Sequence, residues 1–283
     1  MPELDFSQLP EVFALTLFAG LATAIGGAVA FFHRKEGRDS GRFLSASLGF
    51  SAGVMIYISL VELMAEASGG LRKACGDFQG GLFAMLAFLA GLLITLLIDK
   101  LVPEIENPHH VRKQAEVEEA VHATAEDRAK LGRAGILFAV VIGIHNFPEG
   151  IATFAGGLSG MRIGIPIAIA IALHNIPEGV AIGVPILYAT GSRKKAFLYA
   201  LLSGLAEPAG ALIGFLILAP FLTPAVLAVV FALISGIMVY ISFDELLPMA
   251  ETYGEHHIAL AGVLSGMVFM GIGLEITARL TAA

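Results

Sequence analysis

Two short motifs place ionisable and amide side chains inside otherwise apolar stretches of the chain. They read GIHNFPEG at 143–150 and ALHNIPEG at 172–179. In an α-helix, His145 lies one turn before Glu149 and Asn146 lies three residues before it, so the three side chains share one face. Imidazole, amide oxygen and carboxylate, without a thiolate, suit Zn²⁺ and also Fe²⁺, Mn²⁺, Co²⁺ or Cd²⁺. The spacing therefore predicts a site for a divalent metal ion.

The second motif repeats the same ligand types on the following helix, as His174, Asn175 and Glu178. Two such faces brought together would hold one metal ion, or two adjacent ions that share the glutamates. The proline of each motif lacks an N–H and frees the carbonyl four residues before it, as expected where a helix lines a cavity. The glycine that ends each motif would let a neighbouring helix approach closely.

The charge of these apolar stretches is not balanced by basic residues. Their interiors contain the motif acids and histidines and also Glu207, in SGLAEPAG at 203–210, but no Lys or Arg. An ionisable group at the centre of a bilayer is costly unless it is paired or faces water. Either the carboxylates are protonated or a bound cation supplies the positive charge, and the helical spacing favours the cation. Glu207 alone is equally explained by helix packing.

A second set of side chains could line an entry or exit path: Met55, Glu62, Asp244, Glu245, His256 and His257. Glu62 and Glu245 lie near helix ends, where solvated carboxylates are equally expected. Met55 fits packing better than ion binding. The histidines at 256 and 257 lie in a polar turn where an exiting ion could pause. The polar stretch 102–132, with His109, His110 and His122, is predicted to be a solvated, partly helical loop.

The elements that position these residues are predicted from composition. Hydrophobic residues make up 57% of the 283 residues and charged residues 14%, whereas a soluble protein of this length carries about 25% charged residues. A membrane-spanning helix needs about 20 mostly apolar residues. We therefore predict an all-α polytopic membrane protein with eight transmembrane helices, over residues 9–32, 43–66, 80–99, 134–158, 162–188, 196–219, 224–250 and 257–279.

The distribution of basic residues orients these spans. With the N-terminus outside, all of the 17 Lys and Arg residues lie on the inner side except Arg72, Lys73, Arg162 and Arg279. Cytoplasmic loops carry an excess of Lys and Arg, so both termini are predicted to lie outside.

An internal repeat relates the two ends of the chain. GVMIYISLVELM at 53–64 recurs as GIMVYISFDELL at 236–247, and GLATAIGG at 20–27 is echoed by GLAEPAGA at 204–211. The repeat pairs spans one to three with spans six to eight. Because the offset is an odd number of helices, the second copy is inverted, around the helix pair of spans four and five. Secondary transporters with this plan bind substrate near the bilayer midplane.

The doubled HN.PEG motif and GLAEPAG resemble the signatures of the ZIP (Zrt/Irt-like) divalent-metal transporters, in particular the bacterial ZupT-type branch. The resemblance covers nearly the whole chain, taken as one transmembrane domain over 1–283. It implies a metal importer of the bacterial inner membrane, forming a homodimer, in which spans one, four, five and six move against the other four. The metal would be the substrate and not a prosthetic group.

The resemblance also implies a binuclear site, with ligands carried over residue by residue: His145, Asn146, Glu149, His174, Asn175, Glu178 and Glu207. Some relatives have Gln and Asp at the positions of His174 and Asn175. In some relatives a methionine of span two ligates the metal, and Met55 is its nearest match here.

Other functions fit the residues less well. An intramembrane metalloprotease needs H-E-x-x-H on one helix, and each motif here has a single histidine followed by asparagine. A proton-coupled transporter of a non-metal solute, using protonated carboxylates, is the remaining alternative. The single Cys75 excludes an internal disulfide, no phosphate-binding GxxxxGK[ST] is present, and no basic and aromatic pattern suggests nucleic acid.

Overall fold

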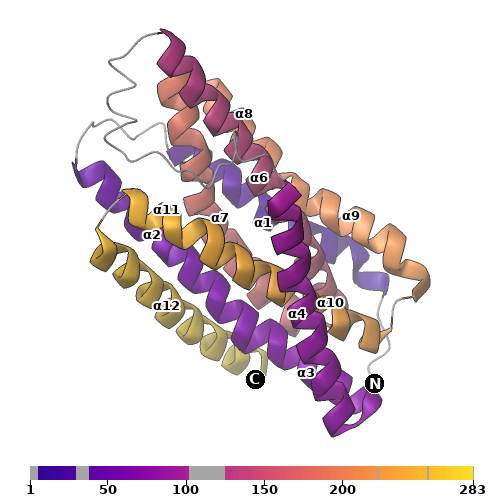
Figure 1. The fold of residues 1–283 in the computed structure, drawn as a ribbon. Coiled ribbons are helices and arrows are strands. Elements are labelled where there is room, and N and C mark those ends of the chain that lie inside the picture. Colours follow the sequence, from indigo (N-terminus) through magenta and orange to yellow (C-terminus); the bar gives the residue numbers. More distant parts are fainter. Residues whose placement is uncertain (1–5, 30–37, 102–124, 222, 254, 283) are drawn as a thin grey trace.

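Every secondary-structure element in residues 6–29, 38–101, 125–221, 223–253 and 255–282, the parts of the chain that the computed structural model describes, is a helix. The long helices lie side by side in one bundle, with α12 and α9 at opposite edges (Figure 1). In chain order the elements are η1 Phe6–Gln8, α1 Leu9–Val29, α2 Arg38–Tyr57, η3 Ile58–Leu63, α3 Met64–Cys75, α4 Asp77–Leu101, α6 Ala125–Leu158, α7 Met161–Thr190, α8 Arg193–Gly204, α9 Ala206–Leu218, η5 Ala219–Phe221, α10 Pro224–Ile241, η6 Ser242–Leu246, α11 Leu247–Tyr253 and α12 His256–Ala282.

Seven stretches of the described residues are long and apolar enough to cross a membrane: Leu9–Val29, Arg42–Cys75, Asp77–Leu97, Met161–Val184, Arg193–Phe221, Pro224–Thr252 and His256–Ile276. The remaining long helix, α6, has 34 residues and contains the predicted span 134–158. The all-helical, multi-pass membrane fold expected from the sequence is therefore confirmed.

Two helices extend beyond their predicted bounds. The second stretch continues through α3 to Cys75, past the predicted end at residue 66, and stops where Gly76 adopts a φ of 87°. Helix α6 begins at Ala125, within the stretch predicted as a loop, because its first residues Ala, Glu, Asp, Arg and Lys include strong helix formers. The loop histidines His109, His110 and His122 lie outside the described residues.

The helices pack as two groups. Helices α1, α6, α7, α8 and α9 contact one another, and so do α2, α3, α4, α10, α11 and α12. The two groups meet mainly where α7 packs on α2 and α6 on α10. We call them the motif group, which contains both HN.PEG helices, and the outer group.

In the outer group, glycine contacts between α2 and α12 are repeated between α10 and α4, the helices that the sequence repeat relates to them. A Cβ on Gly53 of α2 would collide with the carbonyl oxygen of Val263 in α12, and a Cβ on Gly236 of α10 would collide with that of Phe88 in α4. Gly53 and Gly236 occupy the same position in the sequence repeat. The relation also holds in reverse, since Gly266 of α12 lies against Phe50 and Gly91 of α4 lies against Leu233. The α2–α12 and α10–α4 interfaces are thus two copies of one interface.

Glycine contacts in the motif group are repeated between related helices in the same way. Gly179 of α7 lies against the carbonyl oxygen of Thr23 in α1, and Gly150 of α6 lies against that of Glu207 in α9. Helices α1 and α8 meet at Gly20 and Gly204, each of which faces the other's carbonyl oxygen. A pseudo-two-fold axis therefore relates α1, α2, α4 and α7 to α9, α10, α12 and α6, as the predicted inverted repeat requires.

The repeated YIS..EL segments share an unusual backbone. Each forms a π-helical turn, η3 in the first copy and η6 in the second. Such turns are rare and occur mostly as single-turn insertions at functional sites. They carry Glu62 and Glu245 at matching positions.

We expect Gly236→Val to destabilise the folded protein by about 1–3 kcal/mol, because the added side chain overpacks the contact with α4. Thermal unfolding of the detergent-solubilised protein, followed by size-exclusion chromatography, measures the effect. Gly69→Val is the control, since a Cβ at Gly69 meets no atom within 4 Å. Equal melting temperatures for the two variants would contradict the proposed close packing.

Candidate metal centre

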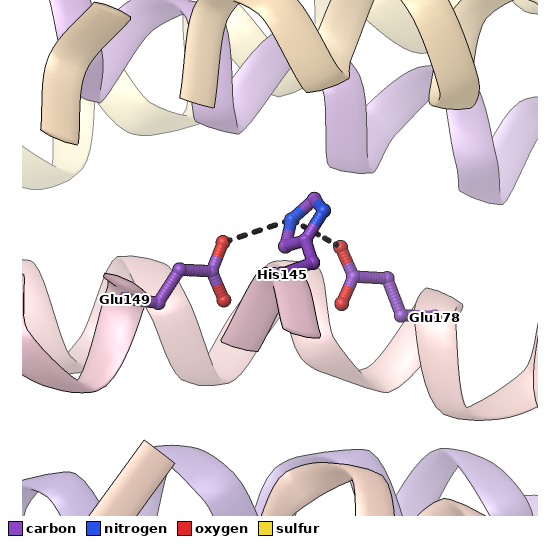
Figure 2. Close-up of side chains that lie close together, drawn as sticks. All are labelled: His145, Glu149 and Glu178. Carbon is purple, nitrogen blue, oxygen red and sulfur yellow. Dashed lines mark ion pairs between the residues drawn. The ribbon is translucent and has the colours of Figure 1, made fainter. Parts of the chain in front are cut away.

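His145 of α6 lies between two carboxylates, one on its own helix and one on α7 (Figure 2). Its Nε2 atom is 3.1 Å from Glu149 Oε1 and 3.7 Å from Glu178 Oε1. All three side chains are buried, and their candidate ligand atoms lie within 4.8 Å of one another. The two motif glutamates therefore face each other inside the bundle and not lipid.

Glu149 contacts the histidines of both motifs. Its Oε1 atom lies 3.0 Å from His174 Nε2, in addition to its contact with His145. Helices α6 and α7 can align their motifs in this way because Gly160, with a φ of 125°, makes the tight turn between them. The Nε2 atoms of His145 and His174 therefore both point toward the same oxygen atom of Glu149.

The asparagines anchor the centre to the flanking helices. Asn175 Nδ2 donates to the carbonyl oxygen of Ala19, at 2.9 Å, and to Glu207 Oε1. Asn146 Nδ2 donates to the carbonyl oxygen of Ser203 at 3.2 Å. Because these bonds use the amide nitrogens, the amide oxygens of both asparagines are left for another partner.

Glu207 reaches the centre from a break in its helix. Helix α8 ends at Gly204 and α9 begins at Ala206, where Pro208 cannot donate a backbone hydrogen bond. The carbonyl oxygen of Glu207 lies against Gly150 of α6, so its helix approaches the motif without an intervening side chain. The side chain of Glu207 is fully buried.

Many oxygen atoms of this centre have no hydrogen-bond partner within the described part of the chain. They are Glu149 Oε2, both oxygens of Glu178, Glu207 Oε2, and the Oδ1 atoms of Asn146 and Asn175. Buried polar atoms without partners are costly, and these are all acceptors. A group of buried acceptors is satisfied by a cation, and the donor set of imidazole, amide and carboxylate fits the divalent metals predicted from the sequence.

The residues predicted to line a path lie at different distances from the centre. Glu245 approaches it, with Oε2 4.0 Å from His145 Nδ1. Asp244 and Glu62 lie on the π-helical turns and are half-buried. Met55 is buried in the hydrophobic core. His256 and His257 are exposed at the start of α12, where His256 Nδ1 lies 2.7 Å from Glu251 Oε1.

Thr23 was not among the site residues predicted from the sequence. It is buried in α1, and its Oγ1 atom has no hydrogen-bond partner among the residues described. The signal was present in the weak repeat, where GLAT at 20–23 aligns with GLAE at 204–207 and so pairs Thr23 with Glu207.

Comparison with known proteins shows the family of the chain. Residues 9–273 match the family described as ZIP Zinc transporter. The chain is 54% identical over 275 residues to the zinc transporter ZupT of Akkermansia muciniphila, covering 96% of this chain and 99% of that protein. Identity is 53% over 275 residues to ZupT of Nitratidesulfovibrio vulgaris, covering 96% and 98%, and 50% over 280 residues to ZupT of Clostridium perfringens, covering 95% and 97%. The chain belongs to the ZIP zinc transporter family.

Proposed function

We propose that this chain imports Zn²⁺ into the cytoplasm by alternating access, through a two-ion site formed by His145, Asn146, Glu149, His174, Asn175, Glu178 and Glu207. As a member of the ZIP family it is a divalent-metal transporter and not an enzyme, and the metal is its substrate and not a prosthetic group. The observation that carries the proposal is the convergence of buried acceptors from α6, α7 and α9. The relatives named as zinc transporters indicate the ion.

The contacts divide the centre into two halves that share the glutamates. The imidazoles of His145 and His174 approach Glu149, whereas Asn175 bonds to Glu207. On each helix the histidine and asparagine lie on opposite flanks of the glutamate. We therefore assign one ion to the histidine half and one to the amide half, with Glu149 and Glu178 between them.

The alternating-access part of the proposal is supported by a cavity between the two helix groups. It has a volume of about 720 Å³ and is lined by residues that include Gln8, Glu66, Gly69, Gly157 and Phe231. It lies at the end of the bundle where α1 begins and α6 turns into α7. On α6 the face that starts at His145 and Glu149 continues through Thr153 to Gly157, so it leads from the centre to this cavity.

The proposed direction of transport, into the cytoplasm, rests on the likeness to the ZIP family. With both termini outside, as the basic residues indicate, the cavity faces the exterior, from which an imported ion would enter. We propose the bacterial inner membrane as the location of the chain. The exposed apolar face of α4, which includes Phe78, Leu93 and Leu97, fits contact with lipid or with the second copy of a homodimer.

We further propose that Fe²⁺, Mn²⁺, Co²⁺ and Cd²⁺ are accepted, because the mixed nitrogen and oxygen set does not impose one geometry. The non-metal alternative gains no support, since buried carboxylates that served only as proton carriers would not need two imidazoles and two amides beside them.

Zn²⁺ uptake into proteoliposomes, together with the number of Zn²⁺ ions bound per purified chain, tests the proposal. We expect saturable uptake and two bound ions in the natural protein, and one bound ion in Glu207→Gln, because that change removes the charged ligand of the amide half only. A chain that binds no Zn²⁺ but takes up solute in response to a pH gradient would contradict the proposal.

A further inference from the structure

The pseudo-two-fold axis assigns Thr23 to the same place in α1 that Glu207 has in α9. The carbonyl oxygen of Glu207 lies against Gly150 of the first motif, and that of Thr23 lies against Gly179 of the second. Three residues earlier, Gly204 and Gly20 contact each other across the axis. The axis exchanges the three predicted ligands of α6 with the three of α7. The seventh predicted ligand is Glu207, and the residue at its symmetry-related position, Thr23, was not predicted to be a ligand.

The amide contacts show which way this position faces. Asn175 Nδ2 bridges the carbonyl oxygen of Ala19 and the carboxylate of Glu207. Asn146 Nδ2 donates to the carbonyl oxygen of Ser203, and Ser203 is the image of Ala19. The axis exchanges Asn175 with Asn146 and the position of Glu207 with that of Thr23. The side chain that faces Asn146 is therefore that of Thr23. Consistent with this, a Cβ built on Gly204, the residue after Ser203, would lie 3.0 Å from the Cβ of Thr23.

Among the residues described, the hydroxyl of Thr23 has no hydrogen-bond partner, which is also true of the buried hydroxyls of Thr153 and Ser203. A helical Thr normally donates to a carbonyl three or four residues earlier. Thr16 in the same helix does so to Phe13, at 2.9 Å, and Thr95 in α4 does so to Gly91, at 2.9 Å. Thr23 is fully buried, yet its Oγ1 atom has no partner in the described ranges. A fully buried hydroxyl of this kind needs a partner that α1 does not provide.

We propose that Thr23 holds a water molecule that completes six oxygen ligands around the ion in the amide half of the site. The other five oxygens come from Asn146, Asn175, Glu149, Glu178 and Glu207. The threonine hydroxyl is two bonds closer to its backbone than a glutamate oxygen, and a bridging water spans that difference. This inference rests on the two-ion site proposed above.

Such a water affects selectivity, because metal ions differ in coordination number. Zn²⁺ in proteins is usually four-coordinate, whereas six oxygen ligands in octahedral geometry suit Mn²⁺. Thr23 therefore makes the amide half more favourable for Mn²⁺ than five protein oxygens alone would. It is a specificity-determining residue for the transported ion.

The test measures Zn²⁺ and Mn²⁺ affinities of the full-length protein in detergent by titration calorimetry. We expect Thr23→Val to weaken Mn²⁺ binding about tenfold, which is the usual effect of losing a residue that hydrogen-bonds to a metal ligand. Zn²⁺ binding should weaken less than about threefold. Thr23→Ser keeps the hydroxyl and should keep both affinities. Thr16→Val is the matched control, because it removes a buried hydroxyl of the same helix that is already bonded to Phe13.

Thr23→Ala provides a second test that does not depend on the fit of valine, and it should show the same fall in the Mn²⁺ to Zn²⁺ affinity ratio. Electron paramagnetic resonance of bound Mn²⁺ in ¹⁷O-labelled water should show one fewer coordinated water in both hydroxyl-free variants. An unchanged affinity ratio and water count would overturn the role of Thr23 while leaving the two-ion site intact. Failure of the natural protein to bind two ions would instead overturn the proposed function.

Discussion

Glu149→Gln is expected to lower Zn²⁺ affinity by more than about 100-fold, which exceeds the usual effect of a residue outside the ligand set, and to abolish measurable uptake. Glutamine has the shape of glutamate and keeps an acceptor oxygen for the imidazoles, so the bundle should still fold. The change removes one negative charge from a buried position that contacts both His145 and His174. Equilibrium binding and proteoliposome uptake measure the two effects separately.

The matched variant Glu178→Gln should have a smaller effect in the state described here. Its carboxylate makes one contact in the centre, 3.7 Å from His145 Nε2, whereas Glu149 makes two at about 3 Å. Glu275→Gln is the control for loss of an acid, because Glu275 is exposed at the end of α12 and paired with Arg279. Zinc binding that survives Glu149→Gln unchanged would rule out Glu149 as a ligand.

Gly69→Phe is expected to reduce uptake by more than about tenfold while leaving equilibrium Zn²⁺ binding in detergent unchanged, because access and closure steps limit turnover in many proteins that move between states. Gly69 lines the cavity between the helix groups, and a Cβ there meets no atom within 4 Å. From this open position the aromatic ring would extend into the proposed route to the centre. The centre itself, which is not part of the cavity lining, should be unaffected.

The control for added bulk is Gly273→Phe, since a Cβ at Gly273 of α12 also meets no atom within 4 Å and that residue does not line the cavity. We expect it to keep normal uptake. Equal uptake by the two variants would mean that the cavity is not on the path, and loss of binding in Gly69→Phe would mean that the substitution disturbs the centre itself.

The sequence predicts the ligand types of the centre more completely than it predicts the packing of the residues around the centre. Ligand types at helical spacing, repeated on two successive apolar helices, bring His145, Glu149 and Glu178 together because a short turn makes the helices antiparallel. Family resemblance identified Glu207, whose acid alone is equally consistent with packing. Thr23 was missed because a single hydroxyl in an apolar helix normally bonds to its own backbone, so that the only signal was its alignment with Glu207 in the weak repeat.

Other features depend on tertiary packing that no local pattern encodes. The approach of Glu245 to His145, at 4.0 Å, brings a residue of the π-helical turn η6 close to a motif residue of α6, although the two lie in different helix groups. The cavity where α6 turns into α7 cannot be read from the sequence, because most of its lining residues are as apolar as the residues of the core. The helices also extend to Cys75 and Ala125, past the hydrophobic stretches, because a helix does not have to end where its apolar residues end.

The exchanged glycine contacts have an energetic consequence for the transport cycle. These contacts lie inside the motif group or inside the outer group, so a movement of one group against the other keeps all of them. Each group can then move as a rigid unit, and the conformations before and after such a movement differ mainly in the contacts of α7 with α2 and of α6 with α10.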